Sequence, residues 1–179
     1  ITLTAYTKSI GDISISTLDL AEIANNALYM PDADAAAKAS AYLDTCMQEH
    51  DSSGGVIECI IDGMPAGIGE PVFDKLDANL AKAIFSIGAV KGGILGGMSD
   101  GAPIVLRAAV KPTPSIFKAQ QTVNRSGENI TLEIKGRHDP VIVPRAVVVV
   151  ESMAALVLVD ALMENMSSRL EHMIEFYNS

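Results

Sequence analysis

The segment VIVPRAVVVVESMAALVLVDALM, residues 141–163, is apolar on almost every side and decides the architecture. At 1.5 Å per residue, a helix of this length spans roughly 35 Å, which is enough to cross a bilayer. However, Arg145, Glu151 and Asp160 interrupt the run, and each charge at mid-membrane depth costs about 2.5–3.5 kcal/mol. We therefore predict no membrane span, but a central helix covered on most faces by other elements.

Shorter elements precede this helix. Their pattern lacks the regular alternation of strand and helix that builds a parallel sheet, so we predict an α+β fold, with antiparallel sheets packed in layers against the long apolar helix. The length of 179 residues suits one domain over 1–179. Expected strands are 1–15 (one strand or a hairpin), 56–62, 104–110 and 130–134, with a turn at 124–129; expected helices are 16–29, capped by Ser16 or Thr17, 32–48, capped by Asp32 or Asp34, and 73–87.

The chain carries a net charge of −9, but its charges are unevenly distributed. Seven bases and three acids between Arg107 and Arg145 give that stretch +4, and the remainder −13. A basic island in an acidic chain favours a small anionic ligand, although a solvated basic face has the same composition. Nucleic acid is disfavoured because Phe117 alone could stack on a base there. The bases are Arg107, Lys111, Lys118, Arg125, Lys135, Arg137 and Arg145.

The two cysteines and three histidines show no metal or redox spacing. Without a CxxC pair or a secretory signal, Cys46 and Cys59 are expected to be buried, reduced thiols of a cytoplasmic protein. The histidines form neither HExxH nor HxH, so no metal site is predicted. The absence of GxSxG argues against a serine hydrolase.

The segment Lys111-Pro112-Thr113-Pro114-Ser115 is a candidate anion site. Each proline pushes the residue before it into extended geometry, so Lys111, Thr113 and Ser115 are expected on one face. One cation and two hydroxyls could then hold a phosphate. An ordinary proline-rich strand exit has the same pattern.

The segment Gly136-Arg137-His138-Asp139-Pro140 gives a second candidate. Pro140 favours an extended Asp139, which is expected to cap the long helix. Arg137 could clamp a carboxylate or phosphate, and Asp139, beside an arginine and a helix N-terminus, should stay ionised and able to accept a proton. An N-cap aspartate in a structural salt bridge is the alternative. Upstream, the glycines of residues 92–97 would let a ligand approach the backbone closely, but they match no phosphate-binding motif.

In order, these motifs resemble the chorismate synthase family. The matching segments are DSxGG at 51–55, GEPVFDKL at 69–76, GGILGG at 92–97, KPTPSI at 111–116, QTVN at 121–124, GRHDP at 136–140 and PRAxxxxExM at 144–153. The resemblance implies a carbon–oxygen lyase of the shikimate pathway to aromatic amino acids. It would convert 5-enolpyruvylshikimate 3-phosphate to chorismate by anti-1,4-elimination of phosphate, with reduced FMN required but not consumed.

The resemblance also implies roles for particular residues. Gly96, the segment Lys111–Ser115 and Arg137 would contact the flavin. Arg137 would also bind the substrate's anionic groups, and Asp139 would manage the proton near flavin N5. A homotetramer is implied too, whereas NADPH is a reductant only if the enzyme reduces its own flavin.

The sequence departs from the family in two places. The GESHG segment, a second catalytic histidine, an arginine cluster and an RSSAR flavin motif are absent from the 179 residues, as is a loop expected between Gly92 and Gly93. We therefore expect a partial chain. The alternative is a catalytically inactive fragment, or an oligomerising module of this fold that binds anions.

Overall fold

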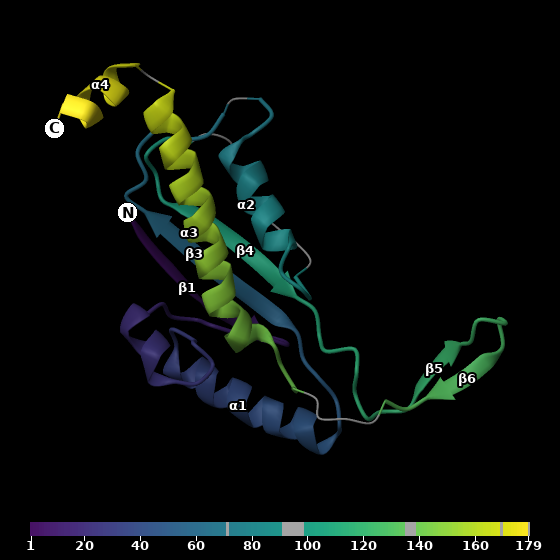
Figure 1. Cartoon of the computed structure of the whole chain (residues 1–179). Coiled ribbons are helices and arrows are strands. Elements are labelled where there is room, and N and C mark those ends of the chain that lie inside the picture. Colours follow the sequence, from purple (N-terminus) through teal and green to yellow (C-terminus); the bar gives the residue numbers. More distant parts are fainter. Residues whose placement is uncertain (71, 91–98, 135–138, 169, 179) are drawn as a thin grey trace. The chain divides into compact units, whose positions relative to one another are not determined.

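The computed structural model describes residues 1–70, 72–90, 99–134, 139–168 and 170–178 (Figure 1). Four strands form a sheet in the order β2-β1-β3-β4, and β5 pairs with β6 in a separate antiparallel ribbon. The strands are β1 Thr2–Ile10, β2 Ile13–Ser14, β3 Gly55–Asp62, β4 Ile104–Val110, β5 Gln120–Val123 and β6 Asn129–Leu132. Strand β1 turns back antiparallel into β2, and β3 and β4 run in opposite directions in Figure 1. The predicted α+β class with antiparallel sheets is confirmed.

The first predicted helix is mostly wrong. Only the 3-10 helix η1, Leu20–Asn25, forms, and its N-cap is Asp19 rather than Ser16 or Thr17. Asn26 ends it, because its side-chain amide donates to the carbonyls of Glu22 and Met30 at 2.9 and 2.8 Å. An asparagine that bonds the backbone in this way competes with helical hydrogen bonds.

The second predicted helix is confirmed as α1, Ala33–Gln48, with Asp32 as its N-cap. Its alanine-rich inner face favours both helix formation and close packing. Ala35, Ala36, Ala39 and Leu43 pack there with Ile10 of β1 and Met30 in a buried core.

Helix α2, Leu76–Phe85, is shorter than predicted at both ends. Phe73, the first residue of the predicted helix, is 90% exposed. Residues 72–74 form a bend, and Lys75 at the N-cap position makes no side-chain cap.

The ribbon of β5 and β6 replaces a predicted loop and a single strand. Thr122 pairs with Ile130 and Val123 with Asn129, and residues 124–128 form the predicted turn. Gly127 adopts φ +80° there, which glycine does without strain.

The contacts divide the chain into two compact units. Unit 1 contains Ile1–Ala5, Ile57–Ala109 and Ala146–Ser179, and unit 2 contains Tyr6–Val56 and Val110–Arg145. The candidate site residues that the structure describes, Lys111–Ser115 and Asp139, belong to unit 2. In unit 1, the amide of Ala5 on β1 donates to Glu151 Oε2 of the long helix at 2.7 Å.

The long helix is α3, Val143–Ser167, and α4, Leu170–Asn178, follows it. Helix α3 starts two residues later than predicted, because Pro144 belongs in a first turn and Val141 forms a parallel bridge with Ser53 instead. One stripe of small and branched side chains is buried, whereas Val148, Leu156 and Val159 are exposed. The described residues of this chain therefore cover α3 only in part. The buried stripe is Ala146, Val147, Val150, Ala154, Leu158 and Ala161.

Among the described residues, α3 is the one helix whose length and composition would suffice for crossing a membrane. A core helix passes the same test, and only 33% of its most apolar window is buried in this chain. The hydrogen bond from Ala5 to Glu151 shows that one face of α3 makes polar contact with protein backbone.

Candidate active site

Three segments that are far apart in the sequence meet in unit 2. They are the turn after α1 (residues 51–54), the exit from β4 (residues 111–115) and the approach to α3 (residues 139–141). The Thr113 hydroxyl donates to the Asp139 carbonyl at 3.2 Å, and the Ser53 amide donates to the Pro140 carbonyl at 2.7 Å. Thr113 of the first predicted anion segment therefore lies beside Asp139 of the second.

The segment Lys111–Ser115 has no regular secondary structure, as its prolines dictate. Lys111, Pro112 and Pro114 are exposed, and Thr113 and Ser115 are half-buried. Within the part of the chain that the structure describes, Lys111 forms no ion pair, so its charge is available to a ligand. The Thr113 proton is already used on Asp139, which leaves that hydroxyl as an acceptor rather than the free donor we expected.

Asp139 is not the N-cap that the sequence predicted. Helix α3 starts four residues later, at Val143, and the carboxylate forms an ion pair with Arg145 in its first turn, with 2.6 Å between Oδ2 and Nη1. The Asp139 side chain is 39% exposed and that of Arg145 is 71% exposed. Asp139 is thus a partly exposed carboxylate in a surface ion pair, and such pairs contribute little to stability.

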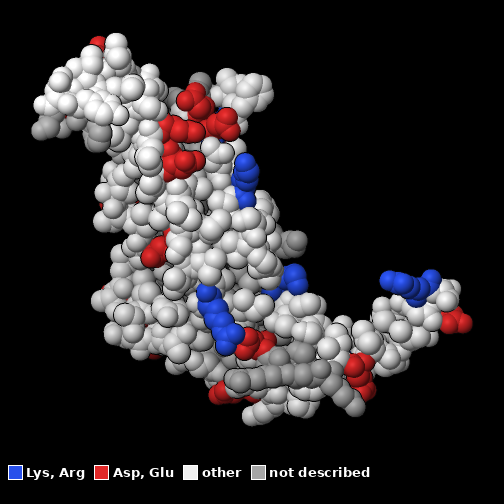
Figure 2. Space-filling view, in the orientation of Figure 1, with Lys and Arg blue, Asp and Glu red and all other residues white. Residues whose placement is uncertain are grey.

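Other bases of the island are also paired. Arg107 lies against the buried Glu58 in unit 1, and the Lys118 ammonium lies 2.9 Å from Asp51 Oδ2 in unit 2. The hydrogen bond from Lys118 lowers the pKa of Asp51 below its usual range, and the Ser52 amide adds to this shift. On the face seen in Figure 2, basic side chains stand apart from one another rather than forming a continuous patch. Among the described bases of the island, Arg107, Lys118 and Arg145 are thus each paired with an acid.

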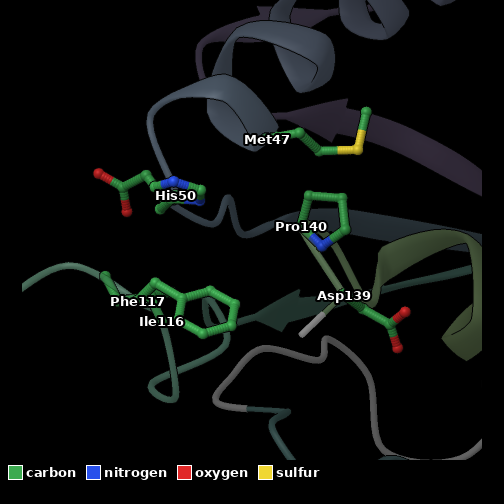
Figure 3. Close-up of a pocket in the computed structure, with 7 residues that line it drawn as sticks. Met47, His50, Ile116, Phe117, Asp139 and Pro140 are labelled. Carbon is green, nitrogen blue, oxygen red and sulfur yellow. The ribbon is translucent and has the colours of Figure 1, made fainter. Parts of the chain in front are cut away.

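A pocket of about 150 Å³ adjoins these segments. His50 and Phe117 meet edge to face on one side of it, with ring centroids 5.6 Å apart. In Figure 3 the Asp139 carboxylate points away from both rings. Sites for drug-sized ligands usually exceed about 300 Å³, so this pocket is too small to enclose a flavin. The rest of its lining is Met47, Asp51, Ile116, Asp139 and Pro140.

Two predicted site residues, Gly96 and Arg137, lie outside the described residues, as does His138. Sequence reasoning missed the part played by Ser52 and Ser53, because their hydrogen bonds reach segments more than 60 residues away. Only the Asp-Ser-Ser-Gly-Gly motif hinted at them, and it reads locally as an ordinary turn. Among the described residues, no group of three or more His, Cys, Asp or Glu side chains could hold a metal ion.

Together, the fold and the site define an α+β protein in which an exposed lysine, Lys111, follows a sheet strand and a partly exposed aspartate, Asp139, precedes a long apolar helix. The chorismate synthase family model matches residues 1–92 and 90–163. The chain belongs to the chorismate synthase family.

Curated relatives agree with this family. The chain is 52% identical to the chorismate synthase of Agathobacter rectalis and 54% identical to that of Lachnoclostridium phytofermentans, in each case over 96% of this chain. It spans only 57% and 58% of those relatives' lengths. A crystal structure of a chorismate synthase shares the fold with a TM-score of 0.72 at 23% identity, over 92% of this chain and 58% of that one.

Proposed function

We propose that the complete protein carrying this chain is a chorismate synthase. It would be a carbon–oxygen lyase that eliminates phosphate from 5-enolpyruvylshikimate 3-phosphate to give chorismate, in the shikimate pathway of aromatic amino acid biosynthesis. The observation that carries the proposal is the hydrogen-bonded junction of Lys111–Ser115 with Asp139, two segments that match the family's motifs.

The residues present fit an anionic flavin cofactor. Lys111 offers an exposed ammonium, Ser115 offers a hydroxyl, and the rigid prolines Pro112 and Pro114 hold the segment open to solvent. Reduced FMN, when bound, would supply electron density to the carbon–oxygen bond that breaks. Flavin contacts by Gly96 and Arg137, and substrate binding by Arg137, belong to the proposal through the family motif alone.

Asp139 would serve as the proton-transferring group of the site. Its carboxylate is partly exposed, and Arg145 donates to Oδ2 at 2.6 Å, so the group would be held where it can take up and return a proton. The tie from Thr113 to the Asp139 carbonyl would fix the backbone at this point while leaving the carboxylate free to act.

Three further properties belong to the proposal through the family resemblance. They are a cytoplasmic location, a homotetrameric assembly and a flavin supplied in reduced form, either by NADPH on the enzyme or by a separate reductase. The exposed apolar residues of α3, such as Leu156 and Val159, support contact with more protein than this chain contains.

The test is anaerobic phosphate release by the complete protein, with reduced FMN and 5-enolpyruvylshikimate 3-phosphate. We expect one phosphate per chorismate and no release without reduced flavin. Absence of release from protein that is folded would overturn the proposed function.

A second candidate function follows from coverage. Because the chain spans about 57% of its relatives' length, we propose that these 179 residues alone are catalytically inactive and retain only anion binding and oligomer contacts. The same assay on a sample whose intact mass is 18.8 kDa should give no phosphate. Turnover by that sample would show that the segments absent here are dispensable.

A further inference from the structure

The turn after α1 links the two segments of the candidate site, the exit from β4 (residues 111–115) and the approach to α3 (residues 139–141). The Ser52 hydroxyl donates to the Thr113 carbonyl at 2.7 Å, and the next residue, Ser53, donates its amide to the Pro140 carbonyl, also at 2.7 Å. Ser53 is buried and its backbone pairs with Val141 in a parallel bridge. One short segment therefore holds both the exit of β4 and the approach to α3.

The hydrogen bonds form a chain that ends at Asp139. Ser52 holds the main chain of Thr113, and the Thr113 hydroxyl in turn holds the main chain of Asp139 at 3.2 Å. A carbonyl that loses its donor in a half-buried place becomes free to reorient toward water. Removing the Ser52 hydroxyl would therefore loosen Thr113 first and Asp139 second.

Gly54 allows the same turn to pack closely against the exit of β4. A Cβ at Gly54 would lie 2.4 Å from the Val110 carbonyl oxygen and 3.0 Å from Pro112 Cδ, so only glycine allows this approach. The ion pair between Lys118 and Asp51, at 2.9 Å, holds the other end of the turn. Ser52 thus acts from a segment anchored on both sides.

We propose that Ser52 is a positioning residue for Lys111–Ser115, the segment proposed to contact the flavin. Its hydrogen bond to the Thr113 carbonyl holds this segment in the geometry that binds the cofactor and places Asp139. This inference rests on the proposed function of Lys111–Ser115. Ser52 would contact neither cofactor nor substrate. It would act by holding the segment Lys111–Ser115, which does.

The experiment is a titration of oxidised FMN into the complete protein, followed by the visible absorption of the flavin. We expect Ser52→Ala to weaken FMN binding about 3- to 10-fold, the change that corresponds to the net loss of one neutral hydrogen bond. Ser52→Thr, which keeps the hydroxyl, should restore binding to within about 2-fold. The thermal unfolding midpoint of each variant shows whether the fold is retained.

Ser86→Ala is the matched control. The Ser86 hydroxyl also donates to a main-chain carbonyl, that of Ala83 at 2.6 Å, but at the end of α2 in unit 1. FMN binding by this variant should equal that of the parent protein. If Ser52→Ala binds FMN as the parent does, or if Ser52→Thr fails as Ser52→Ala does, the positioning role is overturned. If the parent protein itself binds no FMN, the proposed function fails instead.

Discussion

Asp32 and Asp139 are two aspartates that precede helices, yet the structure uses them in opposite ways. Asp32 is 5% exposed and accepts hydrogen bonds from the Ala35, Ser16 and Thr17 amides and from the Ser16 hydroxyl, at 2.8 to 3.1 Å. Asp139 is half-buried, stands four residues before its helix, and has its charge met by the exposed side chain of Arg145. The lone pairs of Asp32 are committed to the fold, whereas those of Asp139 remain accessible for chemistry.

The largest effect that tests this contrast is on turnover. In the complete protein, Asp139→Ala should lower the rate of phosphate release by about 100-fold or more, the range typical of losing a general acid–base group. FMN binding should change by less than about 3-fold, because Lys111 and Ser115 remain. An unchanged rate would refute the role given to Asp139.

Asp32→Ala should act on stability instead. Loss of the α1 cap and of the bonds to Ser16 and Thr17 should lower the free energy of unfolding by about 2–4 kcal/mol, measured by urea unfolding of the chain. Asp34→Ala, at an exposed position in the first turn of the same helix, is the control and should cost less than about 1 kcal/mol. Equal losses at both positions would break the contrast.

The acid dependence of stability should follow Asp32. The Ala35 amide, and then the Ser16 amide and hydroxyl, hold the pKa of Asp32 well below its usual range. The pKa of aspartate in the unfolded state is about 3.9. Below about pH 4 the unfolded state therefore binds a proton before the folded state does, and the free energy of unfolding falls. Above that pH the contribution is complete. Unfolding measured from pH 6 to pH 2.5 should show the gap between the parent and Asp32→Asn narrowing as pH falls, and a constant gap would contradict this.

The smallest effect concerns the partner of Asp139. Arg145→Gln should change the free energy of unfolding by less than about 1 kcal/mol, because an exposed ion pair contributes little to stability. A loss above about 2 kcal/mol in the same urea experiment would mean that the pair is structural, and Asp139 would then resemble Asp32 more than we infer.

The two aspartates also show what the sequence can and cannot predict. Asp32 was recognisable as a candidate cap because capping is local, and an alanine-rich helix follows it directly. Asp139 was misassigned as a cap because the bridge between Ser53 and Val141, which no local pattern encodes, delays the start of α3. The anion segment Lys111–Ser115 was evident from its prolines and its charge. Its support by Ser52 depends on a contact 61 residues away and required the structure.

The exposed face of α3 could not be predicted from the sequence, for a similar reason. An apolar composition on all sides predicts burial, but it cannot say which chain supplies the cover. Within unit 1, Glu151 of α3 contacts the main chain of Ala5, whereas residues such as Val148 and Leu156 are exposed. Hydropathy shows that α3 has apolar surface on all sides. Only the structure shows how much of that surface the described residues bury.

The most direct test of the central claim, that Lys111–Ser115 is the wall that holds an anionic flavin, is the affinity of the complete protein for oxidised FMN with and without the Lys111 charge. We predict saturable binding by the parent protein and binding weakened about 10-fold or more by Lys111→Ala, since a charged hydrogen bond is lost. Lys38→Ala, at an exposed position on α1, should bind as the parent does. Equal affinities of the parent and Lys111→Ala would contradict the claim.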